Sequence, residues 1–162
     1  MKPGTRALGI AESYRGTAGE ATSTLAGVVV RADGAVEDFA FGSCAVGGRD
    51  GTDAIVELWD RLDRPDVRYL FVAGVALAWY NVLDLEAVSR RTERPVLAIT
   101  FEESDGLEDG IESAFDGEAR EARLGAYEAL PRRRRIGVDG TPLFVRSVGL
   151  GRESVDEIVS AY

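Results

Sequence analysis

The sequence lacks histidine altogether and contains one cysteine, Cys44. The absence of histidine excludes Ser-His-Asp and Cys-His nucleophilic catalysis, histidine-based general acid–base chemistry and histidine-ligated zinc. A lone cysteine excludes an intrachain disulfide and a cysteine-cluster metal site. Any bound metal would therefore be held by carboxylate and carbonyl oxygens, which favours magnesium, manganese or calcium.

Lysine is almost absent as well. Of 19 basic residues only Lys2 is a lysine, and 28 acidic residues give a net charge of −9. An acidic chain with so little lysine resembles proteins of salt-loving microbes, although a base-composition bias in the genome would also replace lysine by arginine. The negative charge argues against a generally adhesive nucleic-acid or membrane binder.

No uninterrupted hydrophobic run is long enough to span a membrane. The longest apolar stretch, from Val67 onward, is broken by Arg68, Gly74 and Asn81, and the first ten residues contain no signal-peptide hydrophobic region. We therefore expect a cytoplasmic protein with no membrane partner, and a homodimer is left open. The 162 residues, 45% of them hydrophobic, suffice for a single domain over 1–162.

The stretch from Val67 to Leu97 organises the rest of the chain. The nearly unbroken apolar run Val67–Ala78 predicts a strand buried on both faces. A helix over Leu85–Arg91 and a strand over Pro95–Thr100 follow, which gives a βαβ unit with a right-handed crossover. Ligands bind beyond the carboxyl ends of strands in such sheets, and that edge here carries Ala73, Gly74, Asn81 and Asp84.

Shorter patterns place the remaining elements. Alternating stretches predict strands, apolar residues spaced at three and four predict helices, and an Asp-Gly pair predicts each hairpin turn. The predicted strands are Arg6–Ile10, Thr24–Arg31, Ala35–Phe41, Arg133–Val138 and Leu143–Val148, with a loop over Tyr14–Ser23. The predicted helices are Thr52–Leu62, Gly106–Phe115 with a capping box of Asp105 and Glu108, Gly117–Leu130, and a final helix opened by a capping box of Ser154 and Glu157.

The order of these elements indicates the fold. Three antiparallel strands precede βαβ crossovers, and a second hairpin and a helix complete the chain. This order is that of the ribonuclease H-like fold. The sequence therefore predicts a single-domain α/β protein with a ribonuclease H-like mixed sheet flanked by helices.

Three motifs carry a resemblance to a known family. They are Arg6-Ala7-Leu8-Gly9-Ile10, Asp50-Gly51-Thr52, and Gly74 followed by Tyr80-Asn81-Val82-Leu83-Asp84. Over most of its length the chain resembles the archaeal family known as domain of unknown function ninety-nine, which is itself similar to endonuclease V. The resemblance implies carboxylates at strand ends, which in endonuclease V hold divalent metal and cut a nucleic-acid strand near a deaminated base.

Two positions depart from that family pattern. Relatives usually have an aspartate after the first Gly-Ile and another before the glycine of the central strand, whereas this chain has Ala11 and Ala73. Alanine cannot ligate metal, and two-metal phosphodiester cleavage needs several converging carboxylates. The resemblance thus implies a protein that binds nucleic acid or nucleotide and has weak or lost nuclease activity.

An alternative is an active nuclease with shifted ligands, in which Glu12, Asp50 and Asp84 are catalytic and Glu12 and Asp84 bind magnesium or manganese. Because neighbours on a strand point to opposite faces, Glu12 can replace the aspartate missing at Ala11 only if the strand has already ended. Asp50, with Thr52 and Asp53, would either cap the helix that follows or form the rim of a site. Asp84 would ligate metal or cap the helix at Leu85.

The predicted substrate-binding residues are Gly74, Asn81 and Tyr80. Gly74 would allow close backbone approach, Asn81 would bind substrate or hold a turn, and Tyr80 would stack on a base or pack in the core. The basic run at 132–135 would contact phosphate or neutralise the acidic helix before it. A third alternative is a non-enzymatic interaction domain, which predicts a broad exposed apolar patch.

Overall fold

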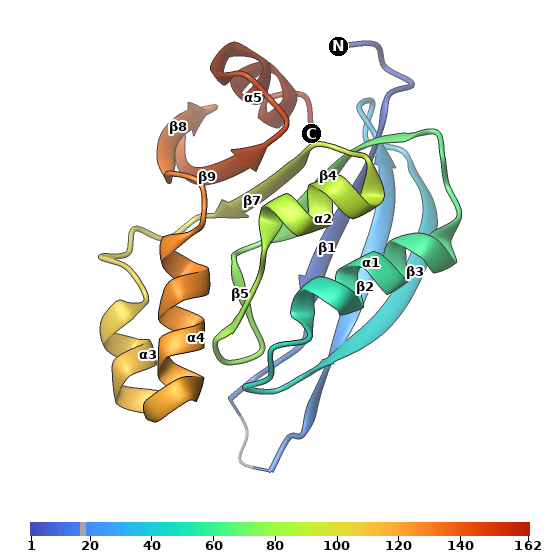
Figure 1. Ribbon diagram of the computed structural model, residues 1–162. Helices are drawn as coiled ribbons and strands as arrows, with labels where there is room; N and C mark the ends of the chain where they lie inside the picture. Colours follow the sequence, from blue (N-terminus) through green and yellow to red (C-terminus); the bar gives the residue numbers. More distant parts are fainter. Residues whose placement is uncertain (17–18) are drawn as a thin grey trace.

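A mixed sheet forms the centre of the computed structural model, which describes residues 1–16 and 19–162 (Figure 1). In these residues the strand order is β3-β2-β1-β4-β7-β9-β8. The strands are β1 (Arg6–Glu12), β2 (Thr22–Arg31), β3 (Val36–Ala45), β4 (Val67–Ala73), β7 (Val96–Thr100), β8 (Arg134–Val138) and β9 (Thr141–Val148). β1, β4 and β7 run parallel to one another, and every other neighbouring pair is antiparallel.

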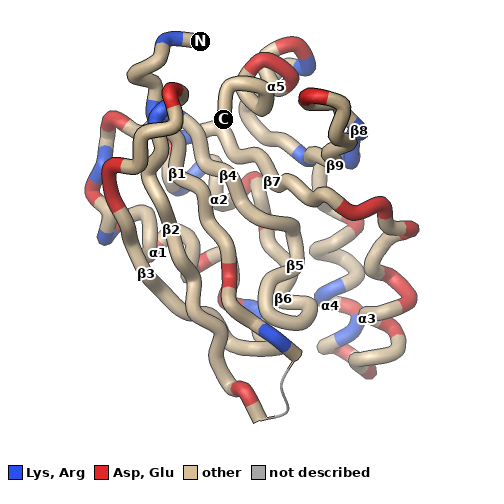
Figure 2. The backbone as a smooth tube through the Cα atoms, turned by 180° about the vertical axis from the view of Figure 1, so that it is seen from behind, with Lys and Arg blue, Asp and Glu red and all other residues tan. Residues whose placement is uncertain are grey.

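Helices cover the two faces of the sheet unequally. The helices are α1 (Gly51–Leu62), α2 (Leu85–Thr92), α3 (Glu108–Ala114), α4 (Gly117–Glu128) and α5 (Arg152–Val159). α1 and α2 pack side by side on one face, where Ile55, Leu58 and Val88 meet Leu8 and Leu70 in the main core (Figure 1). α5 covers part of the other face with Val155 and Ile158, and no helix of residues 1–16 and 19–162 covers the rest, which is called the bare face below (Figure 2).

The predicted architecture is confirmed. The hairpin β2–β3, the βαβ unit β4–α2–β7, and the hairpin β8–β9 all form as the sequence indicates. The turn of β8–β9 places Asp139 and Gly140 at positive φ, as a two-residue hairpin turn requires. The predicted loop over Tyr14–Ser23 includes residues 17–18, which lie outside the described residues, and β2 already begins at Thr22.

The predicted strand Val67–Ala78 is wrong in its second half. β4 ends at Ala73, and the chain leaves the sheet at Gly74 with φ of 92°. The following residues form a small hairpin of β5 (Ala76–Leu77) and β6 (Asn81–Val82). Leu77 and Ala78 are buried because this hairpin packs into the main core, so their apolar character reflects packing and not a longer strand.

Two predicted helix caps are also wrong. α3 begins at Glu108 after Leu107 without a side-chain cap, so Asp105 and Glu108 form no capping box. α5 begins at Arg152 after Gly151, which places Ser154 inside the first turn instead of before it. In both cases a turn residue outside the predicted pair sets the start of the helix, which sequence spacing alone does not resolve.

Candidate functional site

The carboxyl edge of the two central parallel strands carries Ala11 and Ala73. Ile10 and Val72 are paired in register, so the next residue on each strand lies beside the other. Both alanines are exposed and line one cavity on the bare face of the sheet. The two positions where the resemblance implies aspartates are therefore neighbours in space, and neither offers a ligand atom.

Glu12 faces the opposite side of the sheet. β1 continues through Glu12, which pairs with Leu25, so its side chain alternates away from that of Ala11. Its Oε2 accepts hydrogen bonds from the Tyr14 N–H at 2.5 Å and from the Ser23 hydroxyl at 2.6 Å. The condition under which Glu12 could replace the missing aspartate, an earlier end of the strand, is not met.

Asp50 and Asn81 form one hydrogen-bonded pair beneath the start of α1. The buried Asn81 amide donates to Asp50 Oδ1 at 2.7 Å and to the Ala45 carbonyl at 3.0 Å, and its oxygen accepts the Gly51 N–H at 2.8 Å. Asp50 also accepts the Ala45 N–H at 3.0 Å. Asp50 therefore occupies the N-cap position of α1 but makes no capping bond, and Asn81 ties three segments together.

Asp84 caps α2. Its Oδ1 accepts the Ala87 N–H at 2.8 Å, and its own N–H donates to Thr52 Oγ1 at 2.9 Å. A cap of this kind contributes about 1 kcal/mol. In the described residues no three Cys, Asp or Glu side chains are close enough to hold a metal ion, so Glu12, Asp50 and Asp84 are not gathered into one cluster. The residues present do not fit the metal site that the resemblance implies.

A left-handed turn joins β5 to β6. Ala78, Trp79 and Tyr80 have φ of 38°, 61° and 60°, a conformation that costs non-glycine residues about 1 kcal/mol or more each. The Gly47 N–H donates to the Ala78 carbonyl at 2.7 Å, which ties the turn to the glycine-rich loop before α1. Such strain persists only where the surroundings over-determine it, and here it fixes where Tyr80 lies.

Arg123 of α4 fixes this turn by hydrogen bonds to its backbone and to the adjoining loop at Gly47. Arg123 as a residue is 5% exposed, and its guanidinium donates to the carbonyls of Tyr80, Ala119, Gly47 and Gly48. The ring of Phe115 stacks against it at 3.8 Å. Burial lowers the Arg123 pKa, and the nearby charge of Arg49 lowers it further. Arg123 thus acts as a buried cation whose partners are backbone carbonyls.

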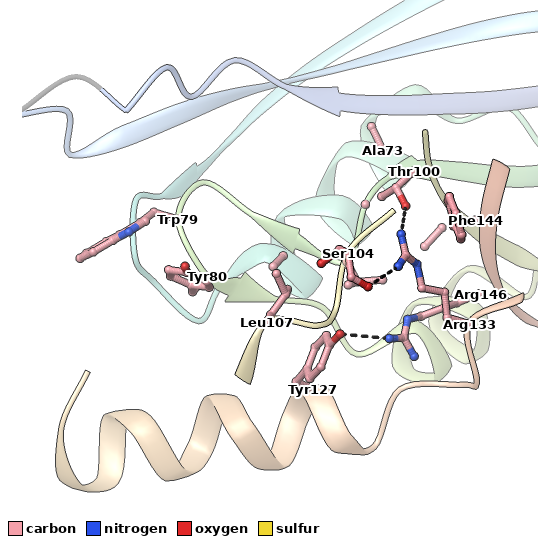
Figure 3. Close-up of a pocket in the computed structure, with 14 residues that line it drawn as sticks. Ala73, Trp79, Tyr80, Thr100, Ser104, Leu107, Tyr127, Arg133, Phe144 and Arg146 are labelled. Carbon is pink, nitrogen blue, oxygen red and sulfur yellow. Dashed lines mark hydrogen bonds between the residues drawn. The ribbon is translucent and has the colours of Figure 1, made fainter. Parts of the chain in front are cut away.

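A cavity of about 370 Å³ opens beyond the carboxyl ends of β4 and β7 (Figure 3). Ala73 and Gly74 form one wall, Trp79 and Tyr80 a second, and residues of the β7–α3 connection, α4 and β9 the remainder. Gly74 and Tyr80, two of the three predicted substrate-binding residues, therefore line the same cavity. Asn81 does not line it and lies buried behind the turn.

Two arginines face this cavity. Arg133 donates to Thr100 Oγ1 at 3.1 Å, and Arg146 donates to Tyr127 Oη at 3.3 Å, as the dashed lines in Figure 3 show. Neither forms a salt bridge in the described residues. Within the part of the chain that the structure describes, Arg134 of the run 132–135 pairs with Asp156 on α5, and no member of the run pairs with the acidic residues of α4.

Sequence reasoning missed Arg123, Tyr127 and Arg146. A signal for Arg146 was present, because it is the one charged residue in the otherwise apolar or small stretch Leu143–Val148. Arg123 gave no comparable signal, since it stands among the charged residues of an exposed-looking helix. Only the approach of the loop at Gly47 over α4 shows that Arg123 is buried.

The bare face of the sheet carries a second, apolar cavity of about 740 Å³. Phe39, Phe41 and Phe101 on its rim are 62%, 63% and 73% exposed, and Figure 2 shows this face crossed by the uncovered strands β1 to β4. Exposed phenyl rings of this number form the broad apolar patch that an interaction surface would present. No helix in the described part of the chain is long and apolar enough to cross a membrane.

A family model and a related archaeal protein both match most of this chain. A family model described as Endonuclease dU matches residues 3–162. A UPF0215 protein of Pyrobaculum calidifontis is 37% identical over 152 residues, covering 88% of this chain and 78% of the relative.

Two solved structures share the fold of this chain. A protein of unknown function from Archaeoglobus fulgidus has a TM-score of 0.83 and 25% identity, covering 97% of this chain and 86% of its own. Endonuclease V of Ciona intestinalis, solved with a 24mer DNA containing an inosine followed by a ribo-adenosine, has a TM-score of 0.55 at 11% identity, covering 97% and 77%. That likeness confirms the ribonuclease H-like fold. The match over nearly the whole chain and the likeness to archaeal relatives show that this protein belongs to the Endonuclease dU family.

Proposed function

We propose that this protein binds nucleic acid or a nucleotide at the carboxyl edge of β4 and β7 and has weak or no nuclease activity. One observation carries the proposal. Ala11 and Ala73 stand side by side on neighbouring parallel strands, at the edge where ligands bind in such sheets, and they replace the carboxylates that cleavage would need. The cavity beyond them retains aromatic and cationic groups suited to a base and a phosphate.

The family name and the fold suggest which nucleic-acid ligand to test. The Ciona protein of this fold was solved with inosine-containing DNA, and the matching family is described as Endonuclease dU. Inosine and deoxyuridine both carry a deaminated base, so we infer that a single strand containing deoxyuridine or inosine is the best candidate ligand. Tyr80 and Trp79, fixed by the left-handed turn, would stack on the base.

Restoring the two carboxylates tests the proposal. The double variant Ala11→Asp with Ala73→Asp should gain cleavage of a deoxyuridine-containing strand that depends on magnesium or manganese. A matched control is Ala21→Asp with Ala35→Asp, which adds the same charge at two exposed positions away from this edge. Equal cleavage by both double variants, or none by either, would contradict the assignment of this edge as the former catalytic centre.

The alternative of an active nuclease with shifted carboxylates has its own test. Glu12, Asp50 and Asp84 each already accept a hydrogen bond from a neighbouring backbone or side chain, which disfavours a shared metal. Calorimetric titration of manganese in high potassium chloride should show no saturable binding. Saturable binding that Glu12→Ala removes would instead support the shifted ligands.

A second candidate function is a non-enzymatic interaction domain, which the bare apolar face favours. If that face joins two copies of the chain, sedimentation should show concentration-dependent dimers. Phe41→Ser, which removes an exposed phenyl ring from the rim, should then shift the equilibrium to monomer. A monomer at all concentrations in both proteins would exclude self-association through this face.

A further inference from the structure

The cavity beyond β4 and β7 has a charge opposite to that of the whole molecule. The chain carries 28 acidic and 19 basic residues. The described residues that line this cavity nevertheless include Arg133 and Arg146 and no acidic side chain. Two arginines and no acidic side chain in one cavity give it a local excess of positive charge, which suits an anionic ligand.

The protein holds both guanidinium groups in place and leaves part of each unused. A guanidinium has five N–H donors. Arg133 uses three, to Thr100 Oγ1, the Glu102 carbonyl at 2.5 Å and the Ser104 carbonyl at 3.0 Å, which leaves two. Arg146 uses two, to the Pro131 carbonyl at 2.5 Å and Tyr127 Oη, which leaves three.

Aromatic rings fix the planes of both groups. Phe144 stacks against Arg133 at 4.2 Å, and Tyr127 lies against Arg146 at 5.3 Å. Such contacts stabilise a cation and restrict its rotation, so the free N–H donors stay oriented without a ligand. The Nε of each guanidinium has no hydrogen-bond partner in the described residues and is not buried, so at least this spare donor is open to solvent and to a ligand.

The surroundings limit what the ligand can be. The volume of about 370 Å³ is at the small end of ligand sites. A neighbouring hollow shares Arg133, Arg146 and Tyr127 but is rimmed by Asp105, Glu108 and Glu128. A chain of phosphates passing both arginines would run on toward these carboxylates and be repelled. A ligand with one anionic group fits both the arginines and the neighbouring carboxylates, if the anionic group contacts the arginines and an uncharged part of the ligand lies toward Trp79 and Tyr80.

We infer that Arg133 and Arg146 form a binding site for a phosphate monoester, with the attached nucleoside lying toward Trp79 and Tyr80. The inference deepens the proposed function and rests on it for the nucleoside part. A phosphate monoester offers three terminal oxygens, which match the fork of guanidinium donors better than a phosphodiester with two. Two sources supply a monoester of this chemistry: a free mononucleotide and the phosphorylated end of a nucleic-acid strand.

Calorimetric titration tests the site with inorganic phosphate, deoxyuridine 5′-monophosphate and deoxyuridine as probes. Saturable binding of the first two, with no binding of the nucleoside at the same concentration, is the expected result. Arg146→Gln and Arg133→Gln should each weaken monophosphate binding at least about tenfold, because a charge-assisted hydrogen bond is removed. Arg132→Gln and Arg135→Gln are the matched controls, since both arginines are exposed and lie outside the cavity.

A measurement on the unaltered protein covers the case in which a variant does not fold. Phenylglyoxal modifies accessible arginines, and peptide mass spectrometry locates the modified side chains. Deoxyuridine 5′-monophosphate should protect Arg133 and Arg146 and leave Arg132 and Arg135 as reactive as before. Protection of all four, or of none, would overturn the assignment.

Oligonucleotides separate the two sources and the two proposals. A strand with a 5′-phosphate or a 3′-phosphate that binds more tightly than its hydroxyl counterpart identifies a strand end, whereas tighter binding of the mononucleotide alone identifies a free nucleotide. Equal binding of all strands, unchanged by Arg146→Gln, would overturn the monoester site and leave nucleic-acid binding intact. Failure of every strand to bind, with the mononucleotide still bound, would overturn only the proposed binding of a strand.

Discussion

Two groups of arginines lie at opposite ends of the central strands and differ in their partners. At the amino end, Arg6 and Arg64 form salt bridges with Glu37 and Asp66, and red and blue segments lie together there in Figure 2. At the carboxyl end, the partners of Arg133 and Arg146 among the described residues are carbonyl and hydroxyl oxygens. The same side chain is neutralised at one end and kept free of carboxylates at the other.

The difference separates a structural role from a binding role. Ion pairs at the amino end hold Arg64 against its neighbours, and the contacts with carboxylates raise the Arg64 pKa and lower those of Glu37 and Asp66. Carbonyl partners at the carboxyl end orient the guanidinium without cancelling its charge. Substitutions at the amino end should therefore alter stability and spare binding, and those at Arg133 and Arg146 should do the reverse.

The largest expected effect comes from Arg123, which belongs to neither group. Like the carboxyl-end arginines it binds carbonyls, but it is buried, so its loss leaves the carbonyls of Gly47 and Tyr80 without partners. Arg123→Leu should lower the free energy of unfolding by about 3 kcal/mol. Denaturant unfolding measures this, with Arg120→Leu on the same helix as the control. A loss equal to that of the control would show that Arg123 does not hold the turn.

The next effect concerns the aromatic wall of the carboxyl-end cavity. A Cβ at Gly110 would lie 2.2 Å from Tyr80 Oη, so Gly110→Ala must displace the Tyr80 ring and should destabilise by about 2 kcal/mol. Gly125→Ala, on α4 with nothing within 4 Å, is the control and should stabilise by about 0.5–1 kcal/mol. Thermal unfolding of both variants checks the difference. Equal shifts of both would mean that Tyr80 is not confined by Gly110.

Removing a paired arginine should have a smaller effect. Arg64→Gln breaks contacts with Glu37, Asp38 and Asp66 at the surface, and should lower the free energy of unfolding by about 0.5–1 kcal/mol. The loss should shrink at high salt, because exposed ion pairs are screened. Deoxyuridine 5′-monophosphate affinity should not change. A loss of monophosphate affinity in this variant would contradict the assignment of a purely structural role to the arginines at the amino end.

The smallest effect is the dependence of stability on acid. Hydrogen bonding to Arg64 lowers the Asp66 pKa from 3.8 to about 2. Because the Asp66 pKa is lower in the folded state, ionised Asp66 stabilises the fold by its whole contribution above about pH 4, and this contribution is lost as the pH falls toward 2. Because Asp66 is 42% exposed, solvent screening limits its contribution to about 1 kcal/mol or less. Denaturant midpoints between pH 2 and 5 should fall less steeply for Asp66→Asn, and identical slopes would contradict the pairing.

The fold could be predicted because its signals are local. Buried strands, hairpin turns and the Asp84 cap each depend on residues within a few positions of one another, and the structure confirms them. The strand end at Gly74 could not be predicted in the same way. Leu77 and Ala78 are as apolar as a strand requires, and only the packing of the β5–β6 hairpin against the core distinguishes the two arrangements.

The candidate site was predicted in part. The edge of the sheet, Gly74 and Tyr80 were indicated by the βαβ pattern, and both residues line the cavity. The arginines opposite them come from the last third of the chain and reach the site only because β9 pairs with β7. Glu12 was indicated by position along the chain, but alternation along β1 sends it to the other face. Long-range pairing of this kind leaves no local pattern.

The bare phenyl rings of Phe39, Phe41 and Phe101 have a consequence for how the protein behaves in bulk solution. At neutral pH the net charge of −9 makes the molecules repel one another, which opposes aggregation through the exposed apolar face. The isoelectric point is about 4.6, and at that pH the repulsion vanishes while the face remains. The protein should therefore behave as a charge-stabilised colloid, with a sharp solubility minimum near pH 4.6 whose depth depends on these three rings.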